Sequence, residues 1–533
     1  MAQYSTTSPS VVIKETDLAT FVNPSSTTIG ATVGNFIWGP CDTPVVCTNE
    51  DDLLRTFGRP TDENYKDWFT ARNYLLYSSD LRLVRVITPE AKNASDVEDE
   101  ATVIKSTYDF TNKMAALSDE DKTAKFFARY PGTYGNNIRV VVQDKEALED
   151  EHSILAQYLT QLITDDIVAV GVFAGNDMVE FAAYSFNKDA RDFNGESNYI
   201  ISAINERSNY IYAIEKKLIT YTGDKRNKIN IDVTLKGGVL GVPNASAYIQ
   251  GWNIFRDGDL YDVSLLMQAG GDGTVGKHIV DNVASARRDA IACVSPQENE
   301  CVNVPANGTM TKLQESSNNM GYSSYRFMDG NYKYQYDSYN SVYRWVPLNG
   351  DIAGIFAEVD AESAPWFSPG NHTIKDCIKL AFNPSKADRD IMYRYRINPV
   401  TSFTNSGFVL YGDWTGADVT TSFNFVNVRR MFLYIEKTIT QYARNIMWKQ
   451  NDAISQSNFY QSVDPFLRNI QGGRGIQDYR IICDASVNTT EVVSSGKFIA
   501  KIFIKPIYSI RWVELSFVST RSDVTFDEVA STI

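Results

Sequence analysis

The residues whose spacing best suits chemistry form a glycine-rich run, Gly271-Asp272-Gly273-Thr274-Val275-Gly276-Lys277-His278. The run follows a predicted strand and precedes a predicted helix, which is where a phosphate-binding loop stands. Its last position holds His278, whereas such a loop needs the Ser or Thr hydroxyl that binds Mg²⁺. An ordinary turn between a strand and a helix is therefore favoured, and a nucleotide-binding α/β enzyme stays the alternative.

Other chemistry-bearing patterns are weak. There is no GxSxG nucleophile motif, and adjacent acidic residues are expected in a chain with 65 Asp and Glu. The histidines do not lie at metal-ligand spacing with another His or Cys: His152, His278, His372. The cysteines lack CxxC spacing and are expected to be reduced and mostly buried: Cys41, Cys47, Cys293, Cys301, Cys377, Cys483. The sequence therefore predicts no catalytic residue, no metal site, no cofactor and no enzyme activity.

Length, apolar runs and net charge limit the classes of protein to which this chain can belong. With 533 residues, the chain is expected to contain three or four domains, at about 150 residues each. No run approaches the roughly 20 apolar residues of a membrane span, and no secretory signal is visible at the start. A net charge of −14 argues against non-specific binding to nucleic acid.

The elements around the glycine-rich run predict an α/β domain in two parts. The first part holds a strand at 29–37, helices at 51–57 and 65–76, and a strand at 81–88. The second holds a strand at 262–267, a helix at 277–288 and a strand at 290–294. Strand, helix and strand at this spacing predict a parallel pair joined by a crossover.

The segment 90–236 has a different character. It contains 17 Lys and Arg against 25 Asp and Glu, a net charge of −8, and is rich in strand and turn signals. We expect it to be an insertion on the surface, joined to the α/β domain at neighbouring points. A second distinct stretch, Gly321–Tyr343, places many tyrosines among small polar residues, which predicts an ordinary hairpin, with an adaptable contact surface as the alternative.

The C-terminal part predicts one long helix followed by strands. Apolar residues three and four apart from Phe425 to Ile446 form a helical stripe. Period-two alternation predicts strands at 479–484, 498–505 and 511–518, and 10–15 is strand-like at the other end. A terminal strand with unpaired backbone groups promotes aggregation of a monomer, whereas in an assembly it can connect one copy to the next.

Several segments resemble the tail sheath proteins of contractile-tailed bacteriophages. The most specific is the YPGTYGNNIR run at 130–139, which resembles a "PGxxGN" turn of that family. The others follow in the family's order: SPSVVIKETD at 8–17, with Ser10 in place of the usual glycine, Leu235–Gly241, Arg287–Pro296, Asn398-Pro399, Gly407–Trp414 and Asn427–Arg430.

The resemblance implies an α/β and α+β multidomain fold. Its core domain would have a subtilisin-like topology without a protease site, a β-sandwich-rich insertion would project outward, and a C-terminal α+β domain would face a tail tube. The implied division is an N-terminal arm at 1–20, the core at 21–89 and 237–397, the insertion at 90–236, the inner domain at 398–505 and a C-terminal arm at 506–533.

The resemblance also implies a function. The chain would be a structural subunit that polymerises as stacked hexameric rings around the tail tube and contracts to drive the tube through the host envelope. Its partners would be further copies of itself, the tail tube protein, and baseplate and tail terminator proteins, without nucleic acid or membrane insertion. It would be made in the bacterial cytoplasm and reside in the virion. The alternative is the sheath of a related contractile device, a bacteriocin or a secretion system.

Three sets of residues are predicted to carry assembly. The terminal strands would add to a neighbouring copy, with polar hinges at 17–21 and 505–509: Val11, Val12, Ile13, Lys14, Glu15, Trp512, Val513, Glu514, Leu515, Ser516, Phe517. The sheet that accepts them would contain Tyr479, Ile481, Cys483, Phe498, Ala500 and Ile502. Cations on the long helix are candidates for contacts with the tube: Arg429, Lys437, Arg444, Lys449.

Overall fold

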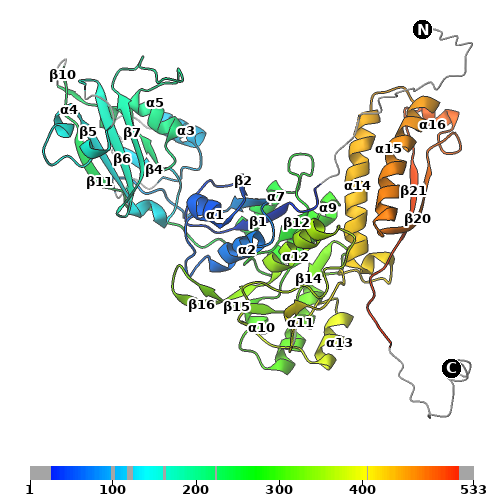
Figure 1. Cartoon of the computed structure of the whole chain (residues 1–533). Coiled ribbons are helices and arrows are strands. Elements are labelled where there is room, and N and C mark those ends of the chain that lie inside the picture. The colour runs from blue at the N-terminus through cyan, green and yellow to red at the C-terminus, as the bar shows by residue number, and fades with distance from the viewer. Residues whose placement is uncertain are drawn as a thin grey trace, which may run out of the picture.

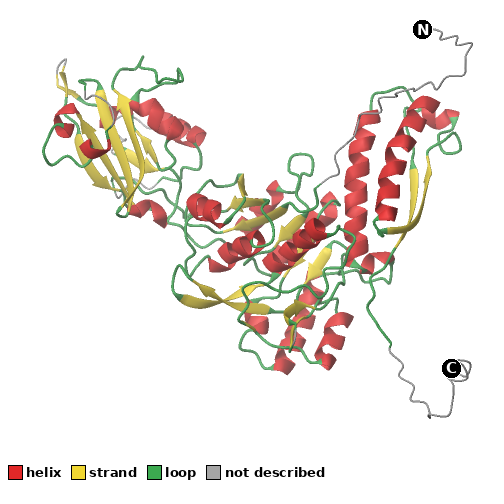
Figure 2. Ribbon diagram, in the orientation of Figure 1, coloured by secondary structure: helices red, strands yellow, loops and turns green. Residues whose placement is uncertain are grey.

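The computed structural model describes residues 26–97, 102–116, 124–159, 164–222, 225–404 and 406–514, and the fold is given for these residues. Figure 1 shows three parts in a row: a β-rich lobe, a central α/β part, and a C-terminal unit dominated by two long helices. Helices and strands alternate in the central part, whereas strands dominate the lobe (Figure 2). The mixed α/β, multidomain class that the sequence predicts is confirmed at this level.

The central part is built on a six-stranded sheet in the order β14-β13-β12-β1-β3-β2. All neighbouring strands are parallel except β2, which runs antiparallel to β3 at one edge. The strands are β1 Gly30–Gly34, β2 Pro44–Cys47, β3 Leu81–Arg85, β12 Leu265–Met267, β13 Ile291–Val294 and β14 Arg326–Met328. The predicted parallel crossover between β12 and β13 is confirmed.

Helices cover both faces of this sheet, because successive strand residues point to opposite sides. Leu265 and Met267 face one apolar cluster, which includes α2 and α12, and Leu266 faces a second cluster under α7, α8 and α11. The covering helices are α2 Tyr65–Leu75, α7 Ala245–Ile254, α8 Gly273–His278, α11 Ala306–Met320 and α12 Asn349–Glu362. A π-helical stretch, Ile279–Ala284, and α9 Ser285–Arg287 continue α8. Shorter helices lie at its margins: α1 Glu50–Phe57, α10 Glu298–Cys301 and α13 Lys386–Arg394.

The β-rich lobe contains a four-stranded antiparallel sheet in the order β11-β5-β6-β7. Its strands are β5 Ile138–Asp144, β6 Ile167–Ala174, β7 Asp177–Ser185 and β11 Asn230–Thr234. One face packs on α5 Ile200–Arg207 and on the pair β4 Phe126–Ala128 and β8 Ile211–Ala213. Smaller elements complete it: α3 Thr107–Ala116, α4 Lys145–Leu148, α6 Glu215–Leu218, β9 Tyr221–Thr222 and β10 Lys225–Arg226. In the described residues this second layer is a short pair and a helix, so the expected β-sandwich is not a pair of full sheets.

The lobe joins the central part at neighbouring points of the chain. Ser95 and Lys236 exchange two backbone hydrogen bonds of 2.8 Å, and Lys92 bridges to Val239. The fully buried guanidinium of Arg85 on β3 donates to the carbonyl oxygens of Phe36, Gly39 and Pro131. The turn after Pro131 therefore packs directly on the core, and Gly132, at a φ of 135°, could not carry a Cβ there without meeting the Ile37 oxygen at 2.6 Å.

The second half of the tyrosine-rich stretch enters a hairpin, as the favoured interpretation predicts, whereas its first half supplies β14 to the central sheet. β15 Tyr332–Asp337 pairs with β16 Val342–Pro347, and β17 Lys379–Leu380 adds a third strand. A further pair, β18 Val400–Phe403 and β19 Gly407–Leu410, leads toward the C-terminal unit.

Candidate assembly interface

The C-terminal unit consists of a helical hairpin packed on a two-stranded sheet. α14 Val426–Ile446 and α15 Ala453–Gly472 lie side by side, with β20 Ile476–Ile482 and β21 Lys501–Pro506 beside α15 (Figure 1). One apolar cluster joins all four elements, including Ile435 of α14, Leu467 of α15 and Ile481 of β20. The short helix α16, Thr490–Ser494, lies between the two strands in sequence.

The two faces of this sheet differ. Tyr479 pairs with Ile504 and Ile481 with Ile502, and these side chains pack against the helices. The opposite face carries Arg480, Lys501, Phe503 and Lys505, all exposed. Phe503 is 54% exposed among these cations, so the outward face combines an apolar side chain with positive charge.

Each strand of this sheet has one edge without a partner strand in the residues that the structure describes. Such an edge presents unpaired N–H and C=O groups that an added strand can use. Of the residues predicted for the accepting sheet, Tyr479, Ile481 and Ile502 lie in its strands. Cys483 follows β20, and Phe498 and Ala500 precede β21, so these three are wrongly placed in strands although they contact the same cluster.

The predicted connecting strands are described only in part. Val11, Val12, Ile13, Lys14 and Glu15 lie outside the described residues, as do Leu515, Ser516 and Phe517. Trp512, Val513 and Glu514 are described, have no strand partner and are exposed. Trp512 is 80% exposed, so a large apolar side chain stands in solvent where the described chain ends.

Two of the four helix cations predicted to point outward are held by their own chain: Arg429 is buried and Lys437 is half-buried. Arg429 is 7% exposed, donates to Ser324 Oγ at 2.6 Å and lies 3.8 Å from the ring centre of Phe423. Lys437 forms an ion pair with Asp262 and donates to the backbone oxygen of Ser26 at 3.0 Å. The prediction failed for both because these partners come from distant parts of the chain.

The remaining two cations are accessible. The Arg444 side chain is 59% exposed and pairs with Asp259 of the central part, and Lys449 is exposed after the end of α14. Contact of these residues with a tube protein stays a prediction.

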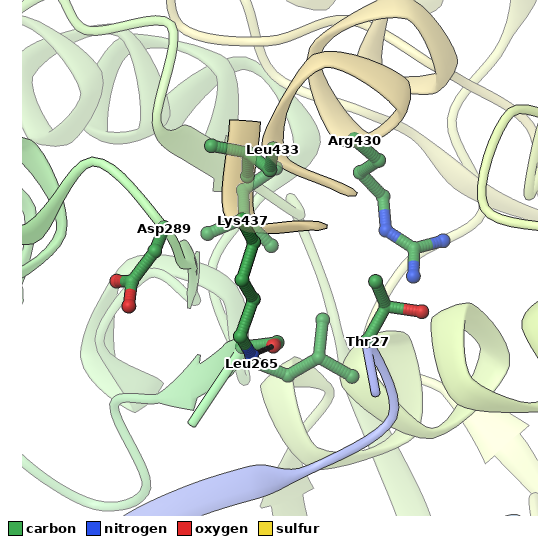
Figure 3. A pocket seen from close by; sticks show the side chains of 8 residues that line it. Thr27, Leu265, Asp289, Arg430, Leu433 and Lys437 are labelled. Carbon is green, nitrogen blue, oxygen red and sulfur yellow. Dashed lines mark hydrogen bonds between the residues drawn. The ribbon is translucent and has the colours of Figure 1, made fainter. Parts of the chain in front are cut away.

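The first half of α14 is a junction with the central part rather than a free surface. Arg430 pairs with Asp360 of α12 at 2.5 Å, both side chains 3% exposed, and Thr27 donates to the same carboxylate at 2.5 Å. Burial raises the pKa of Asp360, and the Arg430 charge opposes that rise. Figure 3 shows Arg430 and Lys437 reaching from α14 toward Thr27 and Leu265. The cavity between them is about 10 Å³, which is room for about one water at most.

The glycine-rich run does not form a phosphate cradle. The Asp272 side chain caps α8 by accepting from Val275 N at 2.9 Å, so a carboxylate occupies the place where a phosphate would bind. The Lys277 ammonium pairs with Asp281 at 2.9 Å instead of reaching back to the loop. This geometry weighs against the nucleotide-binding alternative.

The crevice where α/β sheets bind ligands is filled by protein. Such sites lie at the carboxyl ends of the strands where the strand order reverses, here between β1 and β12. There Asp67 accepts hydrogen bonds from Asn35 N (2.7 Å), Gly270 N (2.8 Å) and Tyr248 Oη (2.5 Å). Burial raises the pKa of Asp67. The carboxylate thus ties three segments together instead of facing a ligand.

Sequence reasoning missed the helix α15. Polar residues and Pro465 interrupt its pattern, but signals were present: Asp452 caps it by accepting from Ser455 N at 2.8 Å, and its inward residues are three and four apart. In the described parts of the chain there is no group of three or more His, Cys, Asp or Glu that could hold a metal. None of the helices described there is long and apolar enough to cross a membrane.

Two regions match known protein families. Residues 272–415 match the phage tail sheath protein central domain, and residues 418–519 match the phage tail sheath C-terminal domain. The tail sheath protein of Vibrio phage KVP40 is 28% identical over 673 aligned residues, covering 98% of this chain and 99% of that protein. The tail sheath protein of Enterobacteria phage T4 is 28% identical over 659 residues, with the same two coverages.

A solved structure shares the fold. The sheath of the extracellular contractile injection system PVC, in its contracted state, aligns with a TM-score of 0.55 at 15% identity. The alignment covers 97% of this chain and 99% of that one.

Proposed function

We propose that this chain is a member of the phage tail sheath protein family and the repeating structural subunit of a contractile bacteriophage tail sheath. The observation that carries the proposal is the sequence similarity to two tail sheath proteins over 98% of the chain. The central part would then be a non-catalytic scaffold of subtilisin-like topology, in keeping with its filled crevice.

The finer proposal concerns how the subunit works. Copies form stacked hexameric rings around a tail tube in an extended state, and a baseplate signal starts contraction. Each subunit moves as a nearly rigid body and gains new contacts, which drives the tube through the host envelope. A transition of this kind needs one sequence with two sets of interfaces that differ by some kcal/mol, and no nucleotide. The partners are further copies, the tube protein, and baseplate and terminator proteins of the virion.

The open edges of β20 and β21 support strand addition as the link between copies. Residues 11–15 and 512–517 of neighbouring copies would each add a strand to this two-stranded sheet. Each backbone hydrogen bond gained contributes about 0.5–1.5 kcal/mol net, and a polymer repeats that gain at every subunit. Residues 90–236 would lie at the periphery, and the exposed cations Arg444 and Lys449 remain the candidates for tube contact.

A related contractile device, a bacteriocin or a secretion system, is the second candidate, since the PVC sheath shares the fold. The greater similarity in sequence to phage proteins favours the virion. A nucleotide-binding enzyme is the least favoured, because Asp272 and Lys277 are arranged against it.

Electron microscopy of the purified chain tests the proposal. We expect rings or tubes from the full chain, and folded monomers from variants that lack residues 1–16 or 512–533. A Lys277→Ala variant is the matched control and should assemble normally, since the ion pair of Lys277 with Asp281 lies within its own helix region. Compact monomers from the full chain under all conditions would contradict the sheath function. Tubes from both truncations would contradict strand addition alone.

A further inference from the structure

We propose that Arg511 anchors the root of the C-terminal segment, so that residues up to Arg511 move with their own subunit and the connecting segment begins at Trp512. The proposal rests on the proposed function, because it assigns Arg511 the role of positioning the segment that reaches a neighbouring copy. It also moves the pivot away from 505–509, where the sequence predicted a hinge.

The Arg511 guanidinium lies in a slot between two aromatic rings. Its central carbon is 3.8 Å from the ring centre of Trp414 and 3.5 Å from that of Phe425. The two rings are nearly parallel, at 19°, with their centres 6.4 Å apart. Cation–π attraction favours a planar guanidinium on an aromatic face, and here both of its faces are used.

Hydrogen bonds fix the guanidinium within the slot. Nε donates to Asp413 Oδ1 at 2.6 Å, and Nη2 donates to the backbone oxygens of Asp413 (3.1 Å) and Asn424 (3.3 Å). Both members of the ion pair are at least nine-tenths buried. Burial lowers the pKa of Arg511, and the charge of Asp413 opposes that change.

The residues before Arg511 are held as well. Ile507 N donates to Gly475 O at 3.1 Å, which extends the pairing beyond β21. The Tyr508 ring packs on Phe425 with centres 4.9 Å apart, and its hydroxyl lies 2.8 Å from Ser422 Oγ. Ser509 Oγ donates to Asp413. This set of contacts leaves 507–511 little freedom to act as a hinge.

In the described part of the chain, the hydrogen bonds and ring contacts of this stretch end at Arg511, although the Ile510 side chain is itself 84% exposed. Trp512 and Val513 are 80% and 73% exposed and take part in no strand. The anchor thus connects the C-terminal unit to the loop before α14 and presents an exposed apolar pair from a fixed point. A segment that starts from a fixed point loses less conformational entropy when it binds a neighbour than one that starts six residues earlier.

Limited proteolysis tests the anchor in the soluble subunit. Chymotrypsin can cut after Tyr508, inside the anchored stretch, or after Trp512, beyond it. Mass spectrometry of early time points gives the ratio of the fragments ending at 508 and 512. We expect little cleavage at 508 in the parent chain, and at least a tenfold higher ratio in Arg511→Ala.

Two further variants keep the test decisive. Arg511→Lys retains a cation for Asp413 but not the planar group between the rings, so its ratio should lie between those of the parent and Arg511→Ala; it also reports if Arg511→Ala fails to fold. Arg55→Ala removes an exposed arginine of α1, 77% exposed, and should leave the ratio unchanged. An unchanged ratio in both Arg511 variants would overturn the proposal.

Assembly separates this proposal from the proposed function. We expect folded Arg511→Ala to form tubes at least tenfold less efficiently than the parent, with partial rescue by Arg511→Lys. Normal tube formation by folded Arg511→Ala would overturn the positioning role. A chain that ends at Arg511 tests the other claim: if it assembles as the full chain does, the C-terminal connecting strand of the proposed function is wrong, whatever the cleavage ratio shows.

Discussion

At the scale of single residues, a buried carboxylate makes the stability of this chain depend on pH. Asp329 is fully buried beside β14 and accepts from Ser295 Oγ at 2.5 Å and from Asn331 N at 3.1 Å, and among the described residues no Lys or Arg side chain is bonded to it. Burial raises the pKa of Asp329 to about 7. The pKa of this group in the unfolded chain is about 3.9, so the folded state binds more protons between these two values.

That difference predicts how stability depends on pH. Between about pH 4 and pH 7, Asp329 lowers the free energy of unfolding by up to about 1.4 kcal/mol for each unit that the pH rises. Asp329→Asn cannot ionise and can keep the hydrogen bond from Asn331 N, but its amide nitrogen replaces the oxygen that accepts from Ser295 Oγ, which lowers its stability by a similar amount at every pH. Its stability relative to the parent should therefore increase from pH 4.5 to 7, measured by urea unfolding at several pH values. If the free energies of unfolding of the parent and of Asp329→Asn differed by the same amount at every pH, Asp329 would not titrate in this range.

At the scale of elements, regular patterns were predictable and interrupted ones were not. The apolar stripe placed α14 to within a residue, and β12, β13 and the crossover between them followed from a buried strand pattern. α15 was missed because Pro465 breaks its pattern. The inward positions of Arg429 and Lys437 depend on Ser324 and Asp262, which no local pattern could place beside α14.

The inner face of α15 gives a prediction for this element. Leu467 is fully buried among α14, α15 and β20, whereas Tyr460 on the same helix is 43% exposed. Leu467→Ala should cost about 2–5 kcal/mol through lost contacts and a cavity. Hydrogen exchange of the C-terminal unit should quicken in Leu467→Ala and change much less in Tyr460→Ala. Equal effects of the two substitutions would contradict this packing.

At the scale of the whole molecule, the acidic lobe meets the central part through few contacts. Ser95 and Lys236 are neighbours, so residues 96–235 can be replaced by a short glycine linker. Such a variant should fold but melt at a lower temperature, because Arg85 loses the Pro131 carbonyl and Trp38 loses the rings of Tyr130 and Tyr134. Trp38→Ser in the shortened chain should improve its solubility.

Calorimetry of the shortened chain checks whether it folds and at which temperature it melts, and microscopy checks whether it still forms tubes. A cooperative transition together with tube formation would agree with a peripheral lobe. Failure to fold would show that the lobe is part of the core. The sequence predicted an acidic insertion here, but its docking through a buried arginine and main-chain carbonyls leaves no signal in composition.

The position of the acidic lobe has a consequence for many particles in one cell. The lobe lies at the opposite end of the subunit from the C-terminal unit (Figure 1), and its segment carries a net charge of −8. If the C-terminal unit faces the tube, the outside of every sheath is negative, and sheaths repel one another over about 30 Å at 0.01 M salt but only about 3 Å at 1 M. We expect light scattering to detect side-by-side bundles of sheaths when salt or Mg²⁺ is added. Replacing Asp by Asn and Glu by Gln in the lobe should lower the salt concentration at which bundles form. Crowded virions would then stay apart because their surfaces carry charge of the same sign, as the particles of a charged colloid do.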